Sequence, residues 1–343
     1  MPLKYIPILR WKRGERVGLA NLSVGGKANV VPLIVVGADQ FRAKASTISR
    51  PAITAADNFV NELITAWGNA QILIDASTVP HAIGNNPIVD IATSARAKGA
   101  QIVPATRLDA PPAYQAAVLQ VHQADGRGAA LRVDLQEFTD AASWVPNWPI
   151  ALAATDLIVD FAENVTIVDG LGNVIDQAFM QLHQGRAWRS VTMSGSAMPG
   201  NFAGYTQGLH LLRRVELALW RRLAANRLPY TLQYGDYTSV SPNAPPQGIA
   251  WGFPINVRYT LQHDFLICRG VSTTGFGGVD MDQQLLGHAR AIVAYRNRGL
   301  LAHCWADNRI NDIAAGTETS GNLESWVQIG VNRHIELTRQ ILP

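Results

Sequence analysis

Short apolar runs recur along the first 240 residues, and most of them end in a polar or charged residue. Segments that can form helices separate most of these runs, and consecutive runs start about 32 residues apart, the length of one strand–helix unit. Such alternation is typical of a (β/α)8, TIM-like barrel. The predicted strands are Tyr5–Lys12, Val30–Val36, Gln71–Asp75, Gln101–Arg107, Ala130–Gln136, Leu157–Asp160, Arg189–Ser194 and Tyr230–Asp236.

The pattern changes after residue 240, where two short strands and then helical periodicity follow. We expect residues 1–240 to form the barrel and residues 241–343 to form an extension packed on it within the same domain. A loop-rich stretch should separate the two helices of this extension. Its elements are predicted as a β-hairpin over Val257–Leu261 and Phe265–Cys268, and helices over about Gln283–Arg296 and Trp326–Leu342.

The segment Leu209–Ala225 has the most regular helical periodicity in the chain. On a helical wheel, its apolar residues share one arc and its arginines occupy the other, which predicts a core-facing side and a solvated basic side. The arginines on the predicted solvated side are Arg213, Arg214, Arg221 and Arg222.

Composition indicates an ordered globular protein, because 48% of the residues are hydrophobic and 16% are charged. The formal net charge of +3 makes nucleic acid an unlikely partner, although residues 1–27 are basic. No apolar run approaches the roughly 20 residues needed to cross a bilayer, so we expect no membrane association. Cys268 and Cys304 form no disulfide framework, and a cytoplasmic location is expected.

Polar residues at the predicted strand ends are the candidate site residues, because barrel enzymes carry their active sites at the C-terminal ends of their strands. Carboxylates converging there could hold a divalent metal such as Mg²⁺ or Mn²⁺, and the cations could hold a phosphate. We select Lys12, Asp134, Asp236 and Tyr237 as candidate catalytic residues. The strand-end candidates for ligand binding are Lys12, Asp75, Arg107 and Asp160.

A structural role competes with each of these assignments. Barrel interiors bury ion pairs, such as Arg132 with Asp134, since a buried charge must be paired. A strand register that differs by one residue would also turn a side chain away from the mouth. Asp236 is favoured somewhat, because Gly235 gives a flexible strand end beside its carboxylate.

Three stretches of the chain resemble a known family. The first, from Tyr5 to Arg16, reads YIPILRWKRGER, and the second is the Gly235-Asp236-Tyr237 motif. The third is a looser C-terminal pattern: Trp305-Ala-Asp307, Ile310, Gly316, Gly321-Asn322, Trp326, Gly330, Asn332 and His334. Together they resemble the phage Beta protein family along the whole chain.

The resemblance implies a role in conflict between phages and their hosts. Members of this family are encoded by phages, phage satellites and bacterial genomes, in some cases in defence clusters beside a toxic partner. The family supplies no established catalytic residues. The positions that match its motifs, and that we take as candidate site residues, are Arg10, Lys12, Glu15, Asp236, Tyr237, Trp326 and His334.

Two functions from different classes follow. The first is a regulatory or binding protein of phage defence that acts through a protein partner encoded nearby, with a ligand site at the barrel mouth. The alternative is a metal- or phosphate-dependent hydrolase at the same mouth. Three carboxylates within reach of one metal position would favour the hydrolase, whereas strand-end charges paired to one another would count against it.

Overall fold

The computed structural model describes residues 3–47, 49, 51–80, 86–182, 187–243, 254–296 and 304–343. Within these residues, eight parallel strands close into a barrel in which β1 pairs with both β2 and β9. The prediction of a (β/α)8 barrel is confirmed. Its strands are β1 Tyr5–Leu9, β2 Leu33–Val35, β3 Ile72–Asp75, β4 Ile102–Arg107, β5 Ala129–Val133, β6 Thr155–Asp160, β7 Ser190–Ser194 and β9 Leu232–Asp236.

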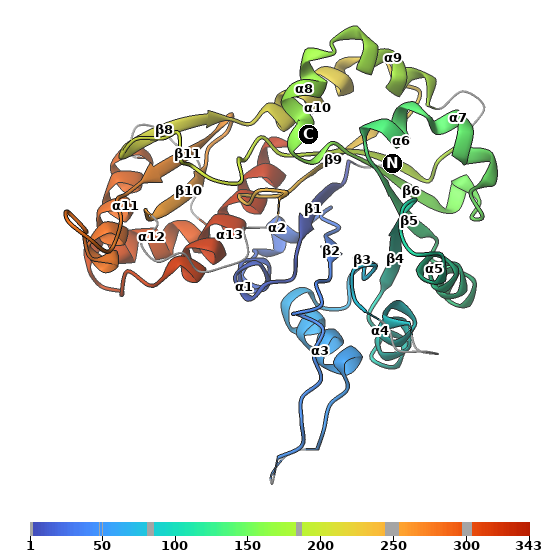
Figure 1. The fold of residues 1–343 in the computed structure, drawn as a ribbon, viewed down its shortest axis with the longest axis horizontal. Coiled ribbons are helices and arrows are strands. Elements are labelled where there is room, and N and C mark those ends of the chain that lie inside the picture. The colour runs from blue at the N-terminus through green and yellow to red at the C-terminus, as the bar shows by residue number, and fades with distance from the viewer. Residues whose placement is uncertain are drawn as a thin grey trace.

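Helices surround the barrel strands on the outside (Figure 1). Apolar side chains of the strands and these helices form one large core, while a second set, which includes Ile6, Leu33 and Val103, fills the barrel interior. The helices are α1 Arg13–Ala20, α2 Val24–Lys27, α3 Ala55–Trp67, α4 Pro87–Ala97, α5 Pro112–Asp125, α6 Leu135–Thr139, α7 Ala141–Trp144, α8 Val165–Gly170, α9 Asn173–Gln181 and α10 Val215–Ala225.

The extension lies beside the barrel (Figure 1), and its described residues form a three-stranded antiparallel sheet and three helices. The strand order is β10-β11-β8, so one strand comes from inside the barrel sequence. The predicted hairpin is confirmed as β10 and β11. The elements are β8 Gly208–Arg213, β10 Asn256–Thr260, β11 Asp264–Arg269, α11 Met281–Arg296, α12 Trp305–Ala315 and α13 Leu323–Ile341.

Helix α13 joins the extension to the barrel. Its first half packs Trp326 and Ile329 into the core of the extension, and its second half packs Val331 and Ile335 into the core of the barrel. The N-cap residue Asn322 accepts a hydrogen bond from a backbone N–H in the first turn. The helix therefore belongs to both hydrophobic cores.

The predicted helix over Leu209–Ala225 is correct only in its second half. Residues 208–213 form β8, which pairs with β11 along its length, and the helix begins at Val215. The apolar residues of this segment fit a helical period, which led to the wrong prediction. β8 is an edge strand, and its neighbours decide which of its side chains are exposed. Arg214, predicted on a solvated face, is 1% exposed.

Further boundaries differ from the prediction. The first strand ends at Leu9 rather than Lys12, and Lys12 is the N-cap of α1. The fifth strand ends at Val133 rather than Gln136, because Asp134 is the N-cap of α6 and forms a capping box with Glu137. The stretch predicted to be loop-rich contains α12. Residues 244–253 and 297–303 of the predicted extension lie outside the described residues. None of the described helices is both long and apolar enough for a bilayer span.

Candidate functional site

A pocket of about 240 Å³ opens at the C-terminal ends of the barrel strands. This mouth pocket is where a barrel of this type is expected to carry its site. Residues from the ends of β1, β2, β4, β5, β6 and β9 contribute to it. It is lined by Ile8, Arg10, Val35, Arg107, Arg132, Val133, Asp134, Asp160, Ala162, Tyr237 and Pro242.

Three strands end in an aspartate that makes the same local turn. Asp75, Asp160 and Asp236 are the last residues of β3, β6 and β9. In each case one carboxylate oxygen accepts a hydrogen bond of 3.0 Å from the backbone N–H two residues later. This is the turn that aspartate side chains favour, and it uses part of each carboxylate to shape the strand end.

Arg132, which lines the mouth pocket, ties two of these aspartates together. Its guanidinium lies 3.6 Å from Asp75 and 3.7 Å from Asp160. Burial alone would lower the pKa of Arg132, but the surrounding negative charges, led by Asp75, raise it instead. The Tyr237 hydroxyl donates to Asp160, and burial together with that carboxylate raises the pKa of Tyr237 well above its usual value. Both carboxylate oxygens of Asp160, which lines the pocket, therefore already accept a hydrogen bond.

The remaining charged groups of the mouth pocket make it rich in donors. Arg10 donates to the backbone carbonyls of Ser241 and Pro242. Arg107, half-exposed, pairs with the exposed Asp109 at 2.9 Å. Since each guanidinium carries several N–H donors and no acceptor, Arg10, Arg107 and Arg132 retain donors beyond these contacts. The pocket thus suits a ligand rich in acceptors.

Backbone strain also lies around this mouth. Trp11, Ala162 and Thr238 have φ angles of 60°, 47° and 56°, a left-handed region that side chains other than glycine rarely occupy. They follow the ends of β1, β6 and β9. Strained backbone of this kind is held in place by its surroundings and gathers at functional sites.

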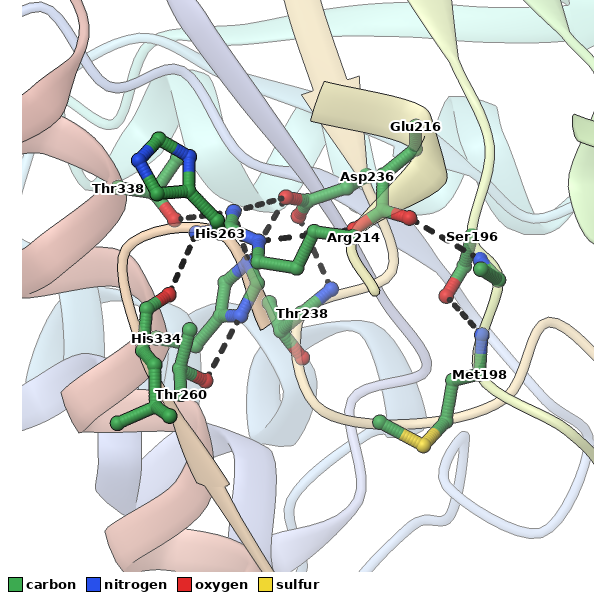
Figure 2. A network of polar contacts seen from close by, with 12 residues as sticks. Ser196, Met198, Arg214, Glu216, Asp236, Thr238, Thr260, His263, His334 and Thr338 are labelled. Carbon is green, nitrogen blue, oxygen red and sulfur yellow. Dashed lines mark hydrogen bonds and ion pairs between the residues drawn. The ribbon is translucent and has the colours of Figure 1, made fainter. Parts of the chain in front are cut away.

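Asp236 does not line the mouth pocket and lies in a buried network that joins barrel and extension (Figure 2). It accepts hydrogen bonds from the Tyr5 hydroxyl at 2.6 Å and from His334 Nε2 at 2.7 Å, and Arg214 lies 3.6 Å away. His334 Nδ1 in turn lies 3.1 Å from the Thr260 hydroxyl. We call this set, completed by Glu216 and Thr338, the buried network.

The buried network has the order carboxylate, imidazole, hydroxyl that serves nucleophilic catalysis in hydrolases. Asp236, Thr260 and His334 are each at most 1% exposed, however, so a substrate has no route to the hydroxyl. Burial lowers the pKa of His334 in spite of Asp236, so its ring is neutral at neutral pH. The arrangement is a structural connection between barrel and extension.

Glu216 completes the charge balance of the buried network. Burial raises its pKa to about 7, although Arg214 lies 3.6 Å away. Asp236 behaves in the opposite way: burial works against its charge, but His334 and Arg214 lower its pKa to about 2. Below about pH 7, where Glu216 is protonated and Asp236 is ionised, the single charge of Arg214 is matched by a single carboxylate.

A family model described as Beta protein matches residues 5–340. The chain belongs to the Beta protein family. Membership makes it a phage-associated protein, as the resemblance of its motifs predicts. No curated protein matches the chain.

Among solved structures, one similar chain is a type I 3-dehydroquinate dehydratase from Clostridium difficile, crystallised with covalently modified comenic acid. It is 11% identical, with a TM-score of 0.40, and the match covers 70% of this chain and 87% of that one.

The structure distributes the candidate residues of this Beta protein family member over several separate places. Asp75 pairs with Arg132, and Lys12 is exposed as the N-cap of α1. Buried Glu15 accepts from the backbone N–H groups of Arg10 and Lys12, and Trp326 packs in the core of the extension. Asp236 and His334 meet in the buried network. The candidates that line the mouth pocket are Arg10, Arg107, Asp134, Asp160 and Tyr237.

Two arginines important to these sites were not among the candidates. Arg132 was expected to pair with Asp134, but it contacts Asp75 and Asp160, because Asp134 turns outward to cap α6. Arg214 lies between barrel and extension. The two-residue alternation in the fifth strand could have indicated that Arg132 points inward, whereas no local pattern marks Arg214 as buried.

Proposed function

We propose that this phage-associated protein is a binding protein whose mouth pocket takes an anionic ligand and which acts through a protein partner. The observation that supports the ligand is the convergence of Arg10, Arg107 and Arg132 on a pocket whose carboxylates already accept hydrogen bonds. Arginine donors in a partly enclosed pocket suit phosphate or carboxylate groups.

The hydrolase alternative receives less support from the geometry. Among the described residues, no group of three or more His, Cys, Asp or Glu side chains is placed to hold a metal ion. The strand-end carboxylates instead pair with Arg132, Arg214, Tyr5 and Tyr237. A divalent metal such as Mg²⁺ or Mn²⁺ is therefore not part of the proposed function.

The anion site is tested by following the unfolding midpoint with increasing inorganic phosphate. A ligand that binds the folded state raises this midpoint. Arg107→Gln should weaken phosphate binding at least about tenfold, because a charged hydrogen bond contributes roughly 1.5–3 kcal/mol. Arg96→Gln is the matched control, since the Arg96 and Arg107 side chains are 39% and 38% exposed and each pairs with one aspartate. Equal affinity in both variants would exclude the mouth pocket as the anion site.

An exposed edge strand supports the protein partner. No described strand pairs with the outer edge of β8, and Leu209 and Leu211 on it are 47% and 55% exposed. Free edges with apolar side chains add strands from other chains. The family resemblance suggests a partner encoded nearby, such as a toxic protein.

Co-purification with the products of the adjacent genes tests this part. Leu211→Lys should abolish the association, because a lysine on a free edge opposes strand addition. The exposed Val174, on α9, supplies a control variant, Val174→Lys, that should leave the association intact. Association that survives Leu211→Lys would place the partner elsewhere.

A further inference from the structure

A groove of about 480 Å³ adjoins the mouth pocket. Asp134 lines both, so the two spaces are neighbours at the start of α6. The groove runs between the segments that follow β5 and β6, on the C-terminal face of the barrel. It is lined by Asp134, Leu135, Gln136, Thr139, Asn164 and Leu171.

We propose that the mouth pocket and this groove together bind a nucleoside monophosphate. The phosphate lies among Arg10, Arg107 and Arg132, and the nucleoside lies in the groove. The proposal rests on the anion-binding role proposed above and specifies its ligand. The joint volume falls within the range of roughly 300–1,000 Å³ that small-molecule sites occupy, whereas the mouth pocket alone is smaller.

The groove offers the groups that a heterocyclic base requires. Gln136 and Asn164 are exposed, and each side-chain amide supplies both donors and an acceptor. The edge of a base presents the same mixture of donors and acceptors, and proteins that bind unpaired bases form hydrogen bonds with this edge. Leu135 and Leu171 provide apolar surface against which the flat face of a base can lie, and Leu171 is 40% exposed. A plain sugar phosphate would have no use for this apolar wall.

Asp134 separates the two halves of the site and limits the ligand to one phosphate. Its Oδ1 accepts from the backbone N–H of Glu137 at 2.8 Å, which fixes the carboxylate at the junction. Its other oxygen is available to a ribose hydroxyl, a partner that carboxylates take in nucleotide sites. A second phosphate at this position would meet the negative charge of Asp134 and be repelled.

Binding measurements by calorimetry on the full chain test the proposal with AMP, GMP, CMP, UMP, adenosine and inorganic phosphate. At least one nucleoside monophosphate should bind about tenfold or more tightly than phosphate, the increment expected from about 1.4 kcal/mol of added contacts. ADP should bind less tightly than AMP. Affinities for all four monophosphates within about threefold of that for phosphate would overturn the proposal.

Two variants separate the groove from the mouth pocket. Gln136→Ala and Leu171→Asp should each remove most of the gain of the nucleotide over phosphate while leaving phosphate affinity unchanged. Val174→Asp is the control for the second, because Val174 is 68% exposed and does not line the groove. Loss of phosphate binding in Gln136→Ala, or an unchanged gain in both groove variants, would contradict the placement of the nucleoside.

The outcomes distinguish this inference from the function on which it rests. Phosphate binding that depends on Arg107, without any gain from a nucleoside, would refute the nucleotide and retain the anion site. Nucleotide binding that is insensitive to Arg107→Gln would refute the anion site in the mouth pocket and, with it, this inference.

Discussion

Asp236 is the residue on which the charges of the buried network depend. Replacing it with asparagine leaves Arg214 buried with only Glu216 beside it, and burial raises the pKa of Glu216 to about 7, so its carboxyl is only partly ionised at neutral pH. Breaking a buried ion pair by removing one partner typically costs about 3–5 kcal/mol. We therefore expect Asp236→Asn to lower the free energy of unfolding by that amount, measured by urea denaturation.

Asp134→Asn is the matched control for this experiment. Asp134 is exposed and caps α6, a role that asparagine fills about as well as aspartate. Its free energy of unfolding should stay within about 0.5 kcal/mol of that of the natural protein. Similar losses in both variants would mean that Asp236 makes no special contribution.

Glu216 gives the protein a stability term that falls as pH rises. Its pKa in the folded state is about 7, raised from 4.5 by burial, so the folded state binds the proton more tightly than the unfolded state. The resulting stabilisation is fully present below about pH 4.5 and is lost as pH rises through about 7. Asp236, with its pKa lowered to about 2, has the opposite dependence: its stabilisation is present above about pH 4 and is lost as pH falls toward about 2.

Comparison with the Glu216→Gln variant isolates the pH-dependent stabilisation that Glu216 provides. Glutamine resembles the protonated carboxyl, and His334, whose pKa burial lowers, is present in both proteins. The free energy of unfolding of the natural protein should fall relative to that of the variant between about pH 5 and pH 8, measured by urea denaturation. A constant difference across this range would show that the Glu216 carboxyl is ionised throughout.

At the residue scale, the sequence could locate the strand-end charges but not their directions. Asp160 and Asp236 both end a strand and make the same turn, yet Asp160 faces the mouth pocket and Asp236 faces the extension. The difference arises from His334 and Arg214, which lie 98 and 22 residues from Asp236 in the chain. Contacts at such separations leave no periodic signal in a single sequence.

At the element scale, the close packing of α1 against α13 requires a glycine. A Cβ at Gly18 would lie 2.8 Å from the Gln328 carbonyl oxygen and 3.0 Å from the Val331 Cβ. Gly18→Ala would therefore push two helices apart and should destabilise the protein by about 1–3 kcal/mol, measured by thermal and urea unfolding.

Gly287→Ala provides the control for the helix packing. Gly287 lies on the exposed side of α11, and a Cβ there would meet nothing within 4 Å. Alanine should stabilise the helix by about 0.5–1 kcal/mol through its helix propensity. If Gly18→Ala were also stabilising, the α1–α13 contact would have to be looser than the structure shows.

The barrel strands were predictable because parallel strands buried on both faces have continuous apolar runs, such as the run that contains β2. The same reasoning failed over residues 208–213, where an edge strand carries apolar residues at positions that also fit a helix. It missed α12 because the helix is mostly polar on its outer side and follows residues without clear periodicity. Edge and surface elements depend on their neighbours more than on their own sequence.

At the scale of the whole molecule, barrel and extension share their interior. Val331 and Ile335 of α13 belong to the barrel core, and His334 between them reaches Asp236 at the end of β9. Asn332 donates to the Gly18 carbonyl at 3.1 Å, so the helix is also hydrogen-bonded to α1. We propose on these contacts that residues 1–240 and 241–343 are one cooperative unit, as the sequence suggested.

This proposal predicts how a truncated form and a divided form of the protein behave. Residues 1–240 alone would lose the α13 side chains from their core and leave Asp236 without its histidine, so they should show no cooperative unfolding transition. The full chain should show one transition that coincides by circular dichroism and tryptophan fluorescence. A protein divided after Asn243 and produced as two co-expressed pieces should fold, because the second piece supplies α13. Cooperative unfolding of residues 1–240 alone would instead make the barrel an independent domain.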